Sequence, residues 1–205
     1  MPNHVLNKVT ICGSKNDIAK CKKQILNTYK DEEGNFTFSF QTIIPRAKSL
    51  DIESSTNIED AVWYVENDCK ELPVSWRSWS RELIDKYTKL GRIAIKNKEL
   101  YGFYDWYEWS IKNWGTKWDC YEVSVDFSDD TISLEFQTAW STPYPVFARL
   151  SEQYPSLSIR VLYADEDFGN NCGEYLLEDG GLKFDNAYNE EFAYDLWGYE
   201  MPEEL

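Results

Sequence analysis

Residues 121–138 read YEVSVDFSDDTISLEFQT, with apolar and polar residues alternating on both sides of a central Asp129-Asp130 pair. Alternation with a period of two is typical of half-buried strands, and two aspartates suit a tight turn. A two-residue loop would pair Val125 with Leu134 and Tyr121 with Thr138, which puts the apolar residues on one face. The stretch therefore predicts a β-hairpin that lines a hydrophobic core.

Tryptophan-rich segments flank this hairpin on both sides. NWGTKWD precedes it at residues 113–119, and TAWSTP follows at residues 138–143. Because the strands fold back on each other, we expect the two segments to meet, with Asp119 opposite Trp140. Pro143 after two hydroxyl residues is typical of a helix start, with proline at the first helical position.

Working outward, the spacing of apolar residues predicts the remaining elements. Before the hairpin we expect a strand over 5–13, a helix over 18–29, a turn at 31–35 and a strand over 36–44 that stops at Pro45. After it we expect a helix over 143–154, strands over 157–164 and 173–179, and a helix over 184–197. The order β-α-β, helical insertion, β-β-α-β-β favours an α+β fold, a ferredoxin-like sandwich.

Residues 46–115 carry helical rather than strand patterns. Helices are expected at about 58–69, 76–90 and 100–114. No linker rich in proline, glycine or serine flanks this stretch. We therefore expect one domain over 1–205, with 46–115 as a mainly helical insertion packed onto the sheet and 165–205 as an acidic, aromatic C-terminal segment.

The net charge of −15 is concentrated near the C-terminus. Residues 165–205 hold thirteen acids against the single base Lys183, which gives −12, while the first 164 residues hold 23 acids and 20 bases, or −3. Such a charge repels phosphate backbones, so direct nucleic-acid binding is not expected. The segment is either a solvated, solubilising surface or a surface that meets a basic partner.

Cysteine and histidine usage argues against a metal site. The five cysteines are widely spaced without a Cys-x-x-Cys pair, and His4 is the sole histidine. These ligand types are too few for the usual zinc sites, so free thiols in a reducing cytoplasm are expected. The N-terminus lacks a secretory pattern, and no apolar run approaches the length of a membrane span. We expect a cytoplasmic protein without cofactor or membrane attachment.

Three segments resemble the YubB-like family of phage- and plasmid-borne proteins with a ferredoxin-like domain. They are MPNHV at residues 1–5 with Asn7, the NWGTKW motif at 113–118, and TAWSTP at 138–143. The resemblance covers the beginning of the chain and about 105–165. It implies the ferredoxin-like fold and an origin in a mobile element of a bacterial host, and it carries over no catalytic residue.

The tryptophan segments admit two interpretations. As scaffold, the indole rings close the end of the sandwich and the Lys117 stem lies on one of them. As a site, flat rings with one cation and hydroxyls near a helix start could hold a small anionic or planar ligand such as a nucleotide. The candidate ligand-binding residues are Trp114, Lys117, Trp118, Trp140, Ser141 and Thr142. Asn3 and His4 could approach the same end.

A catalytic constellation is missing from the sequence. It contains no glycine-rich phosphate loop, no Gly-x-Ser-x-Gly elbow and no cysteine–histidine pair of nucleophile type. We therefore expect a non-catalytic protein that binds a basic host or rival protein, such as a defence factor or a toxin. The candidate partner-binding residues are Asp165, Glu166, Asp167, Glu190, Glu191 and Asp195. A nucleic-acid binder that uses its sheet would need a more basic face than Lys8 and Arg160 provide.

Overall fold

The computed structural model describes residues 2–26, 29–30 and 36–201. The chain divides into two compact units, one formed by residues 1–45 and 110–205 and the other by residues 46–109. The predicted turn at 31–35 lies outside the described residues.

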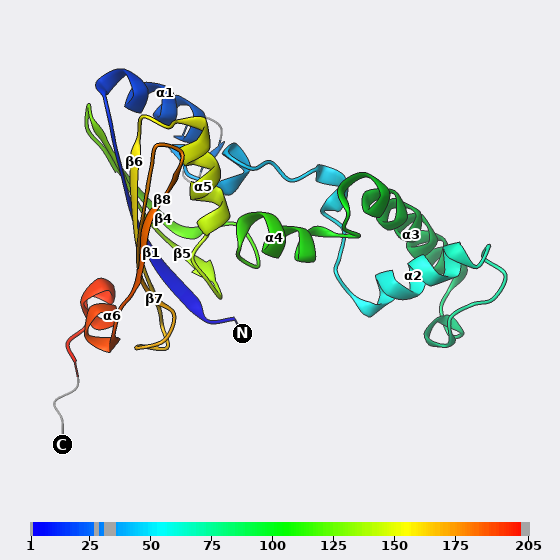
Figure 1. Cartoon of the computed structure of the whole chain (residues 1–205). Coiled ribbons are helices and arrows are strands. Elements are labelled where there is room, and N and C mark those ends of the chain that lie inside the picture. Colours follow the sequence, from blue (N-terminus) through cyan, green and yellow to red (C-terminus); the bar gives the residue numbers. More distant parts are fainter. Residues whose placement is uncertain (1, 27–28, 31–35, 202–205) are drawn as a thin grey trace. The chain divides into compact units, whose positions relative to one another are not determined.

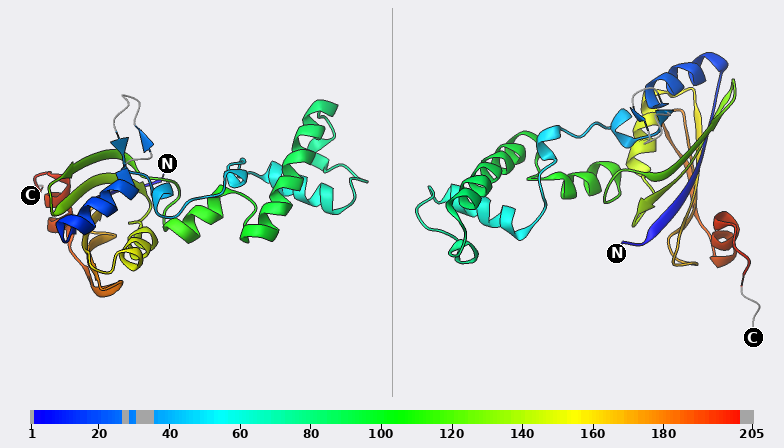
Figure 2. Two further views of the ribbon diagram at one scale, coloured as in Figure 1. Left: turned by 90° about the horizontal axis from the view of Figure 1, so that it is seen from above. Right: turned by 180° about the vertical axis from the view of Figure 1, so that it is seen from behind.

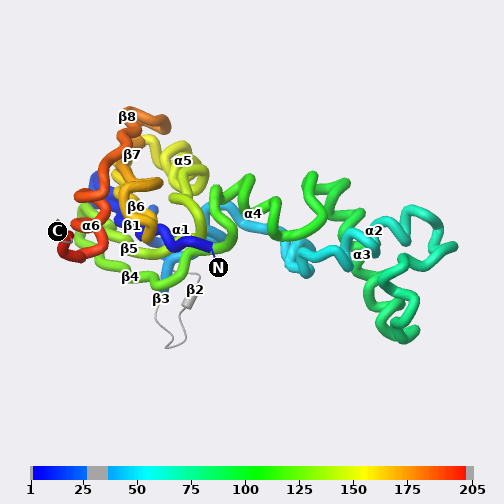
Figure 3. Tube along the Cα trace, turned by 90° about the horizontal axis from the view of Figure 1, so that it is seen from below, coloured from blue at the N-terminus to red at the C-terminus, as the bar shows by residue number. Residues whose placement is uncertain are grey.

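The first unit is built on a six-stranded antiparallel sheet with the order β4-β5-β1-β6-β7-β8, which Figure 3 shows from one edge to the other. Its strands are β1 (His4–Cys12), β4 (Tyr121–Phe127), β5 (Thr131–Ala139), β6 (Ser158–Asp165), β7 (Cys172–Glu178) and β8 (Gly181–Ala187). With helices α1 (Lys15–Leu26) and α5 (Tyr144–Gln153), the first four strands complete the βαββαβ unit of a ferredoxin-like fold. The predicted fold class is confirmed.

Helices cover both faces of this sheet (Figures 1 and 2). Helices α1 and α5 pack on one face, and α6 (Glu190–Trp197) packs on the other against β6 and β7. Side chains alternate along β1, so Val5 and Val9 point to the first face while Leu6 packs with Ala193 and Leu196 on the second. The C-terminal segment thus buries part of the sheet and is not only a solvated tail.

The hairpin forms as the alternation predicts, apart from one bulge. Val125 pairs with Leu134, and Asp129-Asp130 makes the two-residue loop, closed by a 2.9 Å hydrogen bond from the Ser128 N–H to the Thr131 carbonyl. Beyond Ser124 the register shifts, so Tyr121 lies opposite Gln137 rather than Thr138. Glu122 has φ of +51°, and this extra residue on β4 makes the bulge.

The strand predicted over 36–44 is wrong for most of its length. Only Phe36–Thr37 form a strand, β3, which pairs with β2 (Tyr29–Lys30) outside the main sheet, and Phe40–Thr42 form a 3₁₀ turn. The reason is that a side chain, and not a neighbouring strand, accepts a backbone hydrogen bond from this segment. The N–H of Phe40 donates to the Asp119 carboxylate at 2.8 Å. The alternating phenylalanines reflect burial in the core, since Phe38 and Phe40 are both inaccessible.

The predicted helix over 184–197 is also wrong in its first half. Residues 181–187 form β8, and the helix α6 begins only at Glu190. Asp179 and Gly180 have φ of +52° and +73°, the conformation of a tight hairpin turn between β7 and β8. An Asp-Gly pair between two strands is the sequence signal for such a turn.

The second unit is helical. It contains the 3₁₀ turns Lys48–Leu50 and Val74–Trp76 with α2 (Thr56–Glu66) and α3 (Arg81–Tyr101), and α4 (Trp106–Trp114) begins in it. The third predicted helix is shorter than expected because Gly102, at φ of +83°, ends α3 and separates it from α4. A Cβ on Gly91 would lie 2.5 Å from the Ala61 carbonyl oxygen, so glycine lets α3 approach α2 closely.

This helical unit has a hydrophobic core of its own. Its buried side chains are Ile58, Ala61, Val62, Trp76, Tyr87 and Ala94. The unit of residues 46–109 lies within the stretch 46–115 that we expected as a mainly helical insertion. In the part of the chain that the structure describes, no helix combines the length and apolar character needed to cross a membrane.

Candidate functional site

The two tryptophan segments meet, as the hairpin predicts. The Lys117 ammonium lies 4.7 Å from the ring centroid of Trp118 and 5.0 Å from that of Trp140. Both distances fall within the range of cation–π attraction. Trp140 comes from the end of β5 and the other two residues precede β4, so one lysine links both ends of the hairpin.

Tight backbone packing holds the segments together. The Ser141 hydroxyl donates to the Gly115 carbonyl oxygen. Gly115 has φ of +79°, and a Cβ there would lie 2.8 Å from Cδ of Pro145 at the start of α5. Only glycine fits this conformation and this distance. The NWGTKW motif is therefore explained in large part by the fold.

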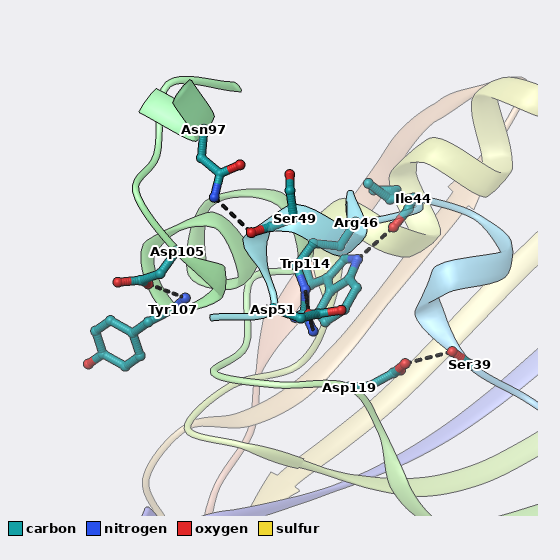
Figure 4. Close-up of polar contacts among 10 residues, drawn as sticks. All are labelled: Ser39, Ile44, Arg46, Ser49, Asp51, Asn97, Asp105, Tyr107, Trp114 and Asp119. Atoms are coloured by element: carbon teal, nitrogen blue, oxygen red, sulfur yellow. Dashed lines mark hydrogen bonds and ion pairs between the residues drawn. The ribbon is translucent and has the colours of Figure 1, made fainter. Parts of the chain in front are cut away.

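Trp114 belongs to the core and not to a binding surface. Its side chain is fully buried, and its indole N–H donates to the Ile44 carbonyl at 2.9 Å (Figure 4). Its ring meets Phe40 edge to face, with centroids 5.9 Å apart. Nearby, Asp119 accepts a 2.6 Å hydrogen bond from the Ser39 hydroxyl, also drawn in Figure 4.

The two hydroxyl residues do not cap the helix that follows them. Pro143 takes the N-cap position of α5, one residue earlier in the helix than expected, and no side chain caps that helix. The Thr142 hydroxyl lies 3.5 Å from that of Tyr175, and Ser141 is engaged with Gly115. Of the other candidate ligand-binding residues, Lys117 and Trp118 are half-buried and Trp140 is exposed.

The N-terminal residues join this cluster. The Trp140 N–H donates to the Asn3 carbonyl at 3.0 Å, and His4 pairs with Ala139 across the β1–β5 ladder. Nδ1 of His4 lies 2.6 Å from the Tyr121 hydroxyl. Tyr121 also donates to the Thr138 carbonyl at 3.2 Å, so the tautomer with a proton on Nδ1 satisfies both contacts.

The charges of two carboxylates act on the Tyr121 phenol. Burial, and then the charges of Glu166 and Glu122, raise the pKa of Tyr121 to about 12. The phenol therefore stays protonated at neutral pH. Since Glu166 and Glu122 are close enough to act on this phenol, negative charge lies beside the cluster, which does not favour binding of a phosphate group.

Three non-glycine residues at or beside this cluster have a positive φ. Glu122, Trp140 and Asn171 have φ of +51°, +76° and +45°, a region that non-glycine residues rarely adopt and that costs about 1 kcal/mol or more for each. The Asn171 amide donates to the Trp140 carbonyl at 2.9 Å, which holds two of these residues together. Sequence patterns did not reveal Tyr121 or Asn171, because strain and bulges leave no periodic signal.

The acidic candidates separate into buried and exposed groups. Asp165 is only 5% exposed and accepts hydrogen bonds from Asn3 and Asn171, so it does not belong to an accessible partner-binding surface. Glu166, Asp167, Glu190, Glu191 and Asp195 are exposed, and we call these five residues the acidic surface.

The acidic surface brings together a loop and a helix. Cβ of Glu190 is 3.3 Å from the position of a Cβ on Gly169 in the β6–β7 loop, and the rings of Phe168 and Tyr194 stack 4.2 Å apart. Lys183, the one base of residues 165–205, is held by Asp179 at 2.6 Å. The carboxylates of the surface are thus left without a basic residue from their own segment.

Residues 113–202 match the family model of the ferredoxin-like domain in Api92-like protein. The matched segment runs from the end of α4 through α6. It excludes β1, which lies between β5 and β6 in the sheet. The matched segment therefore completes its sheet with a strand from the N-terminal part of the chain.

A solved structure agrees with this match. The crystal structure of a protein api92 from Yersinia pseudotuberculosis is similar with a TM-score of 0.50 and 10% sequence identity, over 92% of this chain and 99% of that one. At this identity the likeness concerns the fold alone. A comparison with curated proteins gave no match.

Proposed function

We propose that this chain is a non-catalytic accessory protein that binds a basic protein through the acidic surface. The observation that carries the proposal is the gathering of Glu166, Asp167, Glu190, Glu191 and Asp195 on a loop and a helix of one small region. Complementary charge would steer a basic partner toward this region and speed its association at low salt.

The origin and setting of the protein are part of the same proposal. The YubB-like resemblance of the NWGTKW and TAWSTP segments supports a phage- or plasmid-borne protein in the cytoplasm of a bacterial host. A host defence factor or a toxin of a rival element would then be the basic partner.

Charge neutralisation tests this proposal. The variant Asp167→Asn/Glu190→Gln/Glu191→Gln/Asp195→Asn removes four charges from the acidic surface. A matched control removes four exposed acids from the helical unit: Glu71→Gln, Glu82→Gln, Asp85→Asn and Glu99→Gln. In pulldowns from a bacterial lysate at low and moderate salt, basic proteins retained by the wild type and the control should be lost from the first variant. Equal retention by all three proteins would count against the proposal.

A second candidate function is binding of a small planar ligand at the tryptophan cluster. The observation that favours it is Trp140, which is 39% exposed although its backbone is strained at φ of +76°. Titration with a nucleotide and metabolite panel, followed by tryptophan fluorescence, should then show quenching that Lys117→Ala or Trp140→Phe abolishes. Unchanged fluorescence across the panel would leave the cluster with its role in folding.

A further inference from the structure

The helical unit contains a cavity of about 460 Å³, within the size range of small-molecule sites. One wall is α2, which contributes Ile58 and Val62 from successive turns and Trp63 beside Val62. The opposite wall comprises Tyr104 and the residues that follow it into α4. All lining residues fall within 46–109, so the cavity belongs to this unit alone.

The walls combine apolar bulk with accessible aromatic rings. Ile58 and Val62 form a buried floor, with exposures of 1% and 9%, whereas Trp63 is 43% exposed. Exposing a large indole ring to water is unfavourable, and a ligand that covered the ring would remove this cost. The Tyr104 ring already makes a cation–π contact, with Nζ of Lys98 5.1 Å from its centroid.

The charges of the cavity have one sign. Its lining includes Glu59, Glu66, Asp105 and Glu108, and none of the described residues that line it is basic. Residues 46–109 as a whole carry twelve acids and ten bases, or −2, so the unit is almost neutral. The lining itself therefore carries four acids and no base, with Lys98 against the Tyr104 ring as a neighbouring cation, and is more acidic than the unit as a whole.

We propose that this cavity binds a small organic cation, an alkylammonium or guanidinium group on a short apolar stem. The stem would cover the floor of Ile58 and Val62. The cationic head would lie against the Trp63 ring and the carboxylates of the rim, since an indole face and carboxylates both attract such groups. The proposal concerns the helical unit and does not depend on the acidic surface.

Ligand-observed NMR titration of the full chain tests this assignment, with agmatine as the free cation and N-acetyl-arginine methylamide as the same group in polypeptide form. Whichever binds more tightly identifies the source of the cation. Trp63→Ala should weaken binding by about 2- to 30-fold, the range of cation–π contributions. Glu59→Gln should weaken it less, and 0.5 M NaCl should weaken it further.

Matched controls separate the cavity from general attraction to an acidic protein. Tyr101→Ala and Glu99→Gln alter exposed residues of the same unit outside the cavity and should bind as the wild type does. The Asp167→Asn/Glu190→Gln/Glu191→Gln/Asp195→Asn variant should also retain binding. Absence of binding by both probes at 10 mM, or loss of binding in that four-residue variant but not in Trp63→Ala, would overturn the assignment.

Discussion

At the scale of single residues, the NWGTKW motif requires glycine at position 115. Replacement by alanine would force a Cβ to 2.8 Å from the Pro145 ring at a φ of +79°. We expect Gly115→Ala to lower the free energy of unfolding by about 2–4 kcal/mol, from left-handed backbone strain and this clash together. Urea unfolding monitored by circular dichroism measures the loss.

Gly198 provides the matched control for that substitution. It also ends a helix at a positive φ, +75°, but a Cβ there would have no atom of the described residues within 4 Å. Gly198→Ala should therefore cost only the backbone strain, about 1 kcal/mol. Equal losses in the two variants would contradict the role given to the Pro145 contact.

A second residue, Asp119, accepts hydrogen bonds from the segment after β3 that a neighbouring strand would otherwise accept. Its carboxylate accepts from the Ser39 hydroxyl at 2.6 Å and from the N–H groups of Phe40 and Cys120 at 2.8 and 2.9 Å. Asp119→Ala leaves these donors without their acceptor, so we expect a loss of about 2–4 kcal/mol in urea unfolding. Asp126→Ala, at an exposed position of β4, should change stability by less than about 0.5 kcal/mol.

At the scale of elements, period-two alternation decided what the sequence could predict. It located β1, β5 and β6 and gave the correct Val125–Leu134 pairing, whereas β7 does not alternate, since five of its seven residues are buried. Alternation did not predict the bulge at Glu122, since one extra residue depends on neighbouring contacts. It also mistook Phe38 and Phe40 for strand residues, because burial in the core produces the same pattern as a half-buried strand.

The β7–β8 hairpin was missed for a different reason. Phe184, Tyr188, Phe192 and Leu196 are spaced like one helical stripe, but the Asp179-Gly180 turn places Phe184 on a strand. For the candidate site, the sequence predicted that the two tryptophan segments meet. It could not predict the contact of His4 with Tyr121, which depends on how β1 lies beside β5.

Hydrogen bonds to Glu174 join β6, β7 and the end of β8, and their contribution to the stability of the fold depends on pH. The Tyr188 hydroxyl donates to Glu174 at 2.6 Å, and Nε of Arg160 donates to it at 2.8 Å; these contacts hold the pKa of Glu174 below its ordinary value. A depressed folded-state pKa stabilises the fold above the ordinary glutamate pKa of about 4.3, and the contribution is lost as the pH falls through the folded-state value.

We therefore expect Glu174→Gln to be less stable than the wild type at pH 7, with the difference shrinking below about pH 4. Urea unfolding across pH 3–7 measures both curves. Glu200→Gln, at an exposed position, should show no such dependence on pH. A difference from the wild type that stays constant down to pH 3 would contradict this account of Glu174.

At the scale of the whole molecule, net charge is distributed unevenly along the chain. The helical unit is nearly neutral, while residues 165–205 carry −12 of the total −15. Composition alone predicted this asymmetry. It could not predict that α6 would bury part of the sheet, or that Asp165 would face inward while its neighbours Glu166 and Asp167 face solvent. The acidic surface is what remains accessible once those contacts are made.

The most direct test of the proposed function is photo-crosslinking in bacterial cells that express the protein. A photoreactive amino acid at Tyr199, 58% exposed just after α6, should capture a basic protein. The same amino acid at Phe127, 51% exposed on β4 away from the acidic surface, should not capture it. Capture from position 199 should disappear in the Asp167→Asn/Glu190→Gln/Glu191→Gln/Asp195→Asn variant. No product from position 199, or the same product from both positions, would contradict the proposal.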